Sequence, residues 1–98
     1  MILTVTPNAA VDKTYRVEGF ALDKVHRPTQ TFTVAGGKGI NVARVYQTLG
    51  GTAITTGFLG GTHGRIVAKA LATEKIADEF VTVRGESRLC IAIVDPLH

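Results

Sequence analysis

The segment AGGKGIN at residues 35–41 contains residue types that could bind an anionic or hydroxyl-rich ligand. Gly36 and Gly37 let backbone N–H groups approach a ligand closely, and glycine also accepts positive φ. Lys38 adds a mobile positive charge, and the side-chain amide of Asn41 can donate and accept hydrogen bonds at once. A polyhydroxylated or anionic small molecule fits this set, and a plain connection between a strand and a helix is the alternative.

The same segment does not match the common nucleotide-phosphate loops. A P-loop needs the pattern G-x-x-x-x-G-K followed by Ser or Thr. With Gly37 and Lys38 as the GK pair, Phe32 stands where the first glycine is required, and Gly39 replaces the hydroxyl residue. A G-x-G-x-x-G pattern that starts at Gly37 fails at Val42. The spacing therefore disfavours both a Walker-type and a Rossmann-type nucleotide site.

Other charged side chains are candidates for ligand binding, each with a simpler alternative. The two oxygens of Asp12 can accept from adjacent sugar hydroxyls, and Asp is also a common turn or capping residue. Arg88 precedes an apolar run, and its planar guanidinium can bind a phosphate bidentately; it could also be an exposed charge at a strand end. Lys24 and Arg27 lie in a polar connection and are ambiguous in the same way.

Composition disfavours several classes of function. The chain has 98 residues, a net charge of +3 and one cysteine. Its basic residues form neither the dense patch nor the aromatic platforms expected of a nucleic-acid surface. No apolar run approaches the ~18–20 residues that span a bilayer. A lone Cys90 excludes an internal disulfide and fits a reducing cytoplasm, and the three histidines lack metal-ligand spacing.

Apolar periodicity and glycine-rich turns predict strands that alternate with two helices. The expected strands are residues 2–6, 14–17, 29–34, 53–59, 80–83 and 89–94. The first helix carries an apolar face formed by Val42, Val45, Tyr46 and Leu49, and the second an apolar face formed by Val67, Ala70 and Leu71. This order predicts an α/β fold with a largely parallel sheet. The strands at 14–17 and 29–34 have little apolar content and are expected in a flap off the main sheet.

In such sheets ligands bind beyond the carboxyl ends of the strands. Asp12 and Lys38 are expected in loops at this edge, within residues 7–13 and 35–39. The strand at 89–94 has the apolar character of a central strand in the main sheet. A parallel sheet that stopped there would leave an uncovered edge, so we expect the chain to be a piece of a longer protein.

Three segments together resemble the start of the PfkB, or ribokinase-like, family of sugar kinases. They are TPNAAVD at residues 6–12, AGGKGINVAR at 35–44, and GFLGG with a further glycine at 57–64. The opening segment and the flap are similar to the branch of 1-phosphofructokinase and tagatose-6-phosphate kinase. The resemblance covers essentially the whole chain. It implies that residues 1–98 are the N-terminal part of one ribokinase-like kinase domain, with lid strands at 13–34 and in part of 80–95.

The resemblance also implies a set of residues that bind a sugar phosphate: Asp12, Lys24, Gly36, Gly37, Lys38, Asn41 and Arg88. Asp12 would bind sugar hydroxyls, Asn41 would hydrogen-bond the sugar, and Lys38 would lie near it. Arg88 would hold the phosphate, with Lys24 joining it from the flap. The opening segment departs from the family pattern N-P-A or N-P-S, since Ala9 follows Asn8 where proline is usual and Pro7 stands before it.

The family's catalytic G-A-G-D segment, which supplies the general base, does not occur in residues 42–98. We therefore expect no catalytic residue or metal ligand in this chain and no turnover from it alone. The full-length parent is expected to use ATP and Mg²⁺ to phosphorylate a ketohexose phosphate, first fructose 1-phosphate and next tagatose 6-phosphate. The resemblance further implies a cytoplasmic protein whose β lids can meet across a homodimer.

Other functions stay open from the sequence. A short product could bind a sugar phosphate, or pair with a kinase subunit through its flap, without catalysing a reaction. The parent could also be a kinase of ribose or a nucleoside. A nucleotide-binding Rossmann unit is a weaker alternative because the glycine spacing fails.

Overall fold

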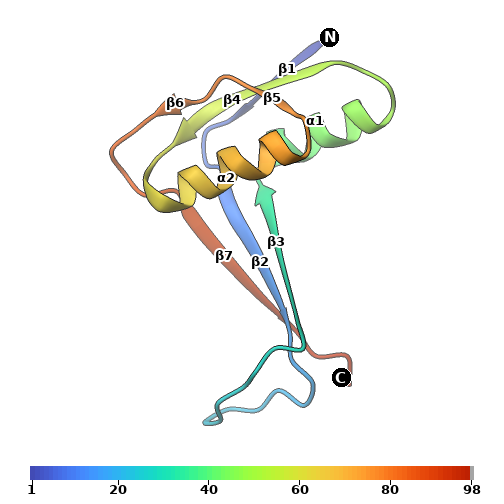
Figure 1. Ribbon diagram of the computed structural model, residues 1–98, viewed down its shortest axis with the longest axis vertical. Helices are drawn as coiled ribbons and strands as arrows, with labels where there is room; N and C mark the ends of the chain where they lie inside the picture. Colours follow the sequence, from blue (N-terminus) through green and yellow to red (C-terminus); the bar gives the residue numbers. More distant parts are fainter. Residues whose placement is uncertain (98) are drawn as a thin grey trace.

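The structure is a computed structural model in which residues 1–97 are described. In chain order its elements are β1 (Ile2–Thr6), β2 (Ala10–Arg16), β3 (Gln30–Gly36), α1 (Lys38–Thr48), β4 (Ala53–Leu59), α2 (Gly61–Thr73), β5 (Ala77–Asp78), β6 (Val81–Thr82) and β7 (Arg88–Val94). They form two sheets that project in different directions from the helices (Figure 1). The predicted α/β class, with a mostly parallel sheet and a small β lid, is confirmed.

The main sheet is parallel and has β4 at its centre. β1 pairs with β4 along its whole length, from Ile2 opposite Ala53 to Thr6 opposite Gly57. The short strands β5 and β6 pair with β4 on its other side. The chain enters β4 through α1 and leaves it through α2, as expected when helices connect parallel strands.

The helices cover one face of the main sheet. Thr4, Ala53 and Thr55 point towards them and are buried, while Leu3 and Val5 on the alternate positions of β1 are 64% and 59% exposed. The core between sheet and helices is made chiefly of Ile40, Ala43, Ala53, Leu59, Val67 and Leu71. The other face of the sheet, which also carries the half-exposed Phe58, is apolar and uncovered.

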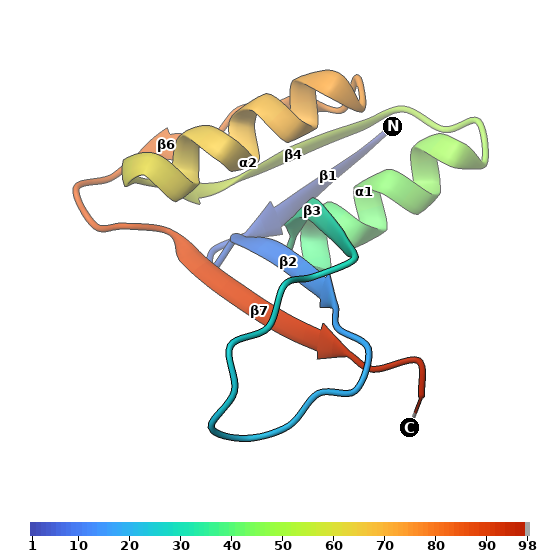
Figure 2. The same cartoon turned by 60° about the horizontal axis from the view of Figure 1, so that its bottom comes forward.

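The second sheet, here called the lid, contains β3, β2 and β7 in that order. β2 is its central strand and runs antiparallel to β3 and parallel to β7. The base of the lid lies against α2, where Val11 and Ala35 are buried. Figures 1 and 2 both show the lid extending from this base away from the helices, and the long loop between β2 and β3 lies at its far end.

Of the four apolar residues predicted to form the face of the first helix, only Tyr46 packs against the core. Ile40 and Ala43 are fully buried, whereas Val42, Val45 and Leu49 are 52%, 58% and 80% exposed. Gly39 explains why this side of α1 faces the sheet. Its backbone lies so close to β1 that a Cβ at this position would be 2.8 Å from the carbonyl oxygen of Val5. The glycine and Ala43 let this side of α1 approach the sheet more closely than the broader apolar stripe could.

Two further expectations about the strands are wrong. The apolar content of residues 89–94 favoured the main sheet, but the strand is β7 of the lid, within the part of 80–95 where the resemblance implied lid strands. Asp12 lies within β2 and not in a loop, because the strand begins at Ala10 instead of residue 14. In both cases the decisive pairing is between residues far apart in the chain, and local apolar content carries no information about that partner.

Candidate functional site

Asp12 and Gly36 meet at the base of the lid, where β2 and β3 enter it. Ala10 pairs with Gly36 on one side and with Arg88 on the other. Because alternate residues of a strand share a face, Asp12 points to the same side of the lid as these two neighbours of Ala10. The carboxylate of Asp12 lies directly over Gly36, so that any Cβ there would collide with it. Glycine at position 36 therefore makes room for the Asp12 side chain.

The chain turns from the lid into α1 through Gly37, whose φ of 131° favours glycine. Gly37 is the N-cap of α1 and makes no side-chain capping hydrogen bond. The first N–H groups of the helix are therefore directed to the region in front of the turn. Together with the positive end of the helix dipole, they favour a negatively charged or hydroxyl-bearing ligand.

Lys38 and Arg88 line one cavity beside this turn. Its volume is about 290 Å³, and its walls are Val5, Thr6, Pro7, Asn8, Gly37, Lys38, Gly39 and Arg88. Both cations are exposed. Two positive side chains at the N-terminus of a helix form a suitable environment for a phosphate group. The structure thus brings the predicted Lys38 and Arg88 together although they are 50 positions apart in the sequence.

The turn before Arg88 is fastened to the start of α2. Glu86 Oε1 accepts a hydrogen bond of 2.6 Å from the backbone N–H of His63. Ser87 Oγ accepts one of 3.0 Å from the N–H of Gly60, and the Ser87 N–H donates to the Gly60 carbonyl at 2.9 Å. The hydrogen bond from His63 lowers the pKa of Glu86, with smaller contributions from charge. His63 and Ser87 therefore serve to hold the strand that begins at Arg88.

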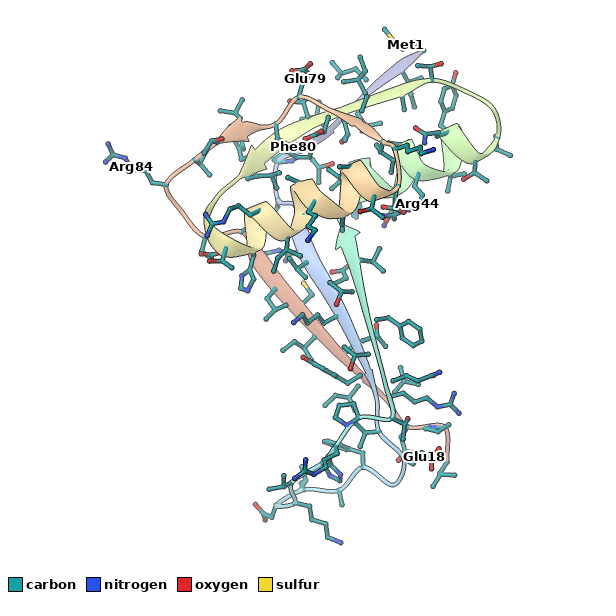
Figure 3. The ribbon with its side chains drawn as sticks, viewed as in Figure 1. Met1, Glu18, Arg44, Glu79, Phe80 and Arg84 are labelled. Atoms are coloured by element: carbon teal, nitrogen blue, oxygen red, sulfur yellow. The ribbon has the colours of Figure 1, made fainter. Side chains whose placement is uncertain are left out.

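Asn41 and Arg44 share the first turns of α1. The side-chain oxygen of Asn41 accepts a hydrogen bond of 2.9 Å from Nη1 of Arg44. Arg44 also binds Glu74, at the end of α2, and the carbonyl of Ala35, at the end of β3. Figure 3 shows Arg44 between the two helices. Sequence reasoning did not single out Arg44; its spacing of three residues from Asn41 was the only local signal.

Lys24 is not near the other predicted residues in this chain. It belongs to the loop between β2 and β3 at the far end of the lid (Figure 1). β3 is seven residues long, so at about 3.3 Å per residue the loop begins roughly 20 Å from the Gly36 end of the lid. The loop is tied to the end of β7, where Asp95 accepts hydrogen bonds from the N–H groups of Gly19 and Phe20.

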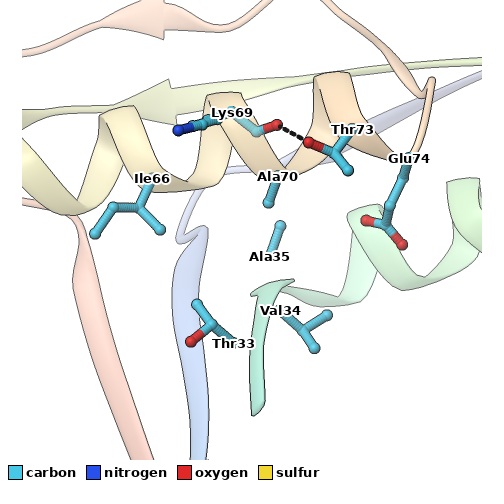
Figure 4. Close-up of a pocket in the computed structure, with 8 residues that line it drawn as sticks. All are labelled: Thr33, Val34, Ala35, Ile66, Lys69, Ala70, Thr73 and Glu74. Atoms are coloured by element: carbon cyan, nitrogen blue, oxygen red, sulfur yellow. Dashed lines mark hydrogen bonds between the residues drawn. The ribbon is translucent and has the colours of Figure 1, made fainter. Parts of the chain in front are cut away.

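A larger cavity, of about 430 Å³, lies between α2 and the end of β3. Figure 4 shows Ala35 facing Ala70 there, with Ile66 and Val34 also on its walls. Its lining is mostly apolar and includes none of the predicted ligand residues. It is thus a groove at the junction of lid and helix, separate from the cavity at Lys38 and Arg88.

No group of three or more His, Cys, Asp or Glu side chains in residues 1–97 is arranged to hold a metal ion. In the same part of the chain, neither helix is long and apolar enough to cross a membrane.

The arrangement of lid, glycine turn and helix is that of a known class of proteins. Residues 5–96 match the pfkB family of carbohydrate kinases. The chain therefore belongs to this family.

Particular relatives are kinases of phosphorylated sugars. The chain is 46% identical over 94 residues to tagatose-6-phosphate kinase from Staphylococcus epidermidis, a match that covers 96% of this chain. Its structure superposes on that of a possible 1-phosphofructokinase from Thermotoga maritima with a TM-score of 0.87 and 39% identity, covering 97% of this chain and 31% of the other. Phosphofructokinase-2 from Escherichia coli, solved in complex with fructose-6-phosphate, gives a TM-score of 0.91 at 27% identity, covering 98% and 32%.

The chain spans 30% of the length of the tagatose-6-phosphate kinase it matches. The chain is thus similar in sequence and in fold to one part of longer kinases, and the predicted membership of a sugar-kinase family is confirmed.

Proposed function

We propose that this chain is the sugar-binding N-terminal part of a longer kinase that transfers a phosphoryl group to a ketohexose phosphate. One observation carries the proposal. A carboxylate, a glycine turn with a free helix N-terminus, and two cations converge at the base of the lid. They are Asp12, Gly36–Gly37, Lys38 and Arg88. This set has separate groups for the hydroxyls and for the phosphate of one ligand.

The hydroxyl end is formed by Asp12 and the turn. An ionised carboxylate accepts two hydrogen bonds and can take one from each of two adjacent sugar hydroxyls. Gly36 keeps the space over the turn free of side chain, so that Asp12 and a sugar ring can approach the backbone. Asn41, in the first turn of α1, supplies a further hydrogen bond to the sugar.

The phosphate end is formed by Arg88 and Lys38 in the 290 Å³ cavity. A guanidinium binds two phosphate oxygens in one plane, and an ammonium adds a point charge that tolerates several ligand positions. Lys24 lies too far along the lid to reach the same cavity within one chain, and we propose that it contributes, if at all, across a dimer formed by two lids. Phe32, Val34 and Val94 are 53%, 42% and 49% exposed on the face of the lid that carries Asp12, and they supply apolar surface for such a contact.

Fructose 1-phosphate is the first proposed substrate and tagatose 6-phosphate the second. The similarity to a tagatose-6-phosphate kinase at 46% identity and to a possible 1-phosphofructokinase at 39% supports both. Their phosphates sit at opposite ends of the sugar. A comparison of the two ligands therefore tests how Arg88 and Asp12 are spaced relative to the accepting hydroxyl.

ATP and Mg²⁺ are proposed to bind to the part of the parent protein that this chain does not include. In phosphoryl transfer the enzyme mainly positions the reactants and stabilises charge, and the residues here would position the acceptor sugar. The isolated chain is proposed to be inactive, since the G-A-G-D segment expected to supply the base does not occur in residues 42–98. The parent is proposed to be cytoplasmic.

The uncovered apolar surfaces favour a part of a larger domain over a self-sufficient binding module. Leu3 and Val5 on the sheet, and Val45 and Leu49 on α1, are all more than half exposed. Large apolar areas of this kind are usually covered in soluble proteins. Further chain that packs on both surfaces would cover them.

The test is a coupled kinase assay on the full-length protein with fructose 1-phosphate, tagatose 6-phosphate and fructose 6-phosphate. We expect turnover with at least one of the first two and its loss in Asp12→Asn, which keeps the size of the side chain but not its charge. Asp23→Asn, in the exposed loop of the lid, is the matched control and should retain activity. Full activity of Asp12→Asn, or no turnover with any sugar phosphate, would contradict the proposal.

A further inference from the structure

Arg44 makes hydrogen bonds to three different parts of the fold. Its Nε and Nη2 donate to the two carboxylate oxygens of Glu74 at 2.6 and 2.9 Å. Nη1 donates to the side-chain oxygen of Asn41 at 2.9 Å, and Nη2 also donates to the carbonyl of Ala35 at 2.9 Å. These four residues are called the Arg44 cluster. The cluster links α1, the end of α2 and the strand that leads into the glycine turn.

The geometry is specific to arginine. The planar guanidinium meets the carboxylate of Glu74 through two parallel hydrogen bonds and still has donors for two further oxygens. The side chains of Arg44 and Glu74 are 27% and 33% exposed. The hydrogen bonds to Glu74 raise the pKa of Arg44, burial opposes this shift, and the charge of Asp12 adds to it weakly. Arg44 is thus a permanent cation close to the proposed sugar site.

The contact with Arg44 settles which way the Asn41 amide faces. Arginine has donors only, so Asn41 can meet it only with its oxygen. The amide nitrogen is then left to donate elsewhere, and within residues 1–97 it makes no hydrogen bond to the protein. In this orientation the amide nitrogen of Asn41 is available as a donor to a ligand at the turn.

The contact with Ala35 acts on the other side of the turn. Ala35 immediately precedes Gly36 and Gly37, and its carbonyl is held to α1 through Nη2 of Arg44. Figure 4 shows Glu74 at the end of α2 beside the start of α1, with Ala35 below α2 at the end of β3. The Arg44 cluster therefore lies where the lid joins the helices.

We propose that Arg44, held by Glu74, is a positioning residue that presents the Asn41 amide as a donor to a hydroxyl oxygen of the sugar. This inference rests on the proposed function, because it requires that Asn41 contacts the sugar. A merely structural role is the alternative. A structural role would appear as a change in melting temperature, which should be small because partly exposed ion pairs generally add little to stability. A positioning role would appear as a change in the KM for the sugar phosphate.

The test is a double-mutant cycle on the full-length kinase with Arg44→Lys and Asn41→Ala. Each single change should raise the KM for the sugar phosphate about tenfold, as for loss of one hydrogen bond, with little change in kcat. The double variant should show no higher KM than Asn41→Ala alone, because Arg44 acts through Asn41. Any lowering of the melting temperature by Arg44→Lys should persist in both backgrounds. Arg65→Lys is the control and should leave KM unchanged, because the guanidinium of Arg65 donates to Thr62 on α2 and not to the Arg44 cluster.

A second variant tests the orientation directly. Asn41→Asp keeps the oxygen that faces Arg44 and gives it a charge, but it removes the donor. We expect its melting temperature to match or exceed that of the wild type and its KM to rise as in Asn41→Ala. If Arg44→Lys does not fold, Glu74→Gln replaces it in the cycle.

The outcomes separate the inference from the proposed function. An unchanged KM in Asn41→Ala would show that Asn41 does not bind the sugar, and would overturn both this inference and that part of the proposed site. A raised KM in Asn41→Ala, combined with an independent and multiplicative effect of Arg44→Lys, would overturn the positioning role and leave the proposed function standing. An unchanged KM in Asn41→Asp would also overturn the proposed role of the amide as donor.

Discussion

Replacing Arg88 with alanine tests whether this guanidinium holds the phosphate of the substrate. Arg88 begins β7 and lies in the cavity beside Lys38 and the glycine turn. A hydrogen bond to a charged group contributes about 1.5–3 kcal/mol. At about 1.4 kcal/mol for each factor of ten, Arg88→Ala should weaken binding of the sugar phosphate about 10- to 150-fold.

The measurement is calorimetric titration of the full-length protein with fructose 1-phosphate and with tagatose 6-phosphate. Unphosphorylated fructose serves as a second ligand, because loss of Arg88 should leave its weak binding unchanged. Arg88→Lys keeps the positive charge but not the planar pair of donors, so it should recover only part of the affinity.

Arg84→Ala is the matched control variant. Arg84 lies in the same connection between β6 and β7, is exposed, and points away from the molecule in Figure 3. Its replacement should change neither affinity nor melting temperature. The assignment of Arg88 would be refuted by equal affinities of wild type and Arg88→Ala, or by an equal loss of affinity for fructose and for its phosphates.

Three further changes test the surroundings of the site. Gly36→Ala forces a methyl group against the Asp12 carboxylate. It should lower the free energy of unfolding by about 1–3 kcal/mol, measured by urea unfolding, and weaken sugar binding, measured by titration. Unchanged stability and affinity would show that the close approach of Asp12 to Gly36 is unimportant. Glu86→Gln should lower the melting temperature at neutral pH. The folded protein lowers the pKa of Glu86 from 4.5, so the ionised carboxylate stabilises the fold above pH 4.5. The difference in melting temperature from the wild type should vanish as the pH falls through the lowered pKa and Glu86 becomes protonated. A pH-independent difference would contradict it. Leu71→Ala should lower the free energy of unfolding by about 2–5 kcal/mol, because Leu71 is 0% exposed. The control Leu49→Ala should have little effect, because Leu49 is 80% exposed. Equal free energies of unfolding for the two variants would place the core elsewhere.

Much of the candidate site could be proposed from residue types. Glycines at 36 and 37, a lysine and an asparagine beside them and a carboxylate at position 12 indicated a ligand with hydroxyls or charge. The failed P-loop spacing turned the interpretation away from a Walker-type site. The family assignment, based on motifs at fixed spacing, is confirmed by the match over residues 5–96.

The contacts of Arg44 show what residue types could not provide. Asn41 lies three positions away on the same helix, so that pairing was within reach of the sequence. Glu74 is 30 positions away at the end of another helix. Only the packing of α1 beside α2 brings the guanidinium and carboxylate into contact, and no local pattern specifies that packing.

The sequence by itself determined the local elements: β1 and β4 lie at the predicted residues, and α1 ends just before the glycines at 50 and 51. Apolar periodicity and glycine act over a few residues, so these features need no knowledge of distant chain. The tertiary structure alone decided that β7 pairs with β2, that Asp12 lies over Gly36, and that α1 buries Ile40 and Ala43 instead of its larger apolar stripe. Each of these depends on which distant backbone or side chain can approach closely, and close approach is decided by packing.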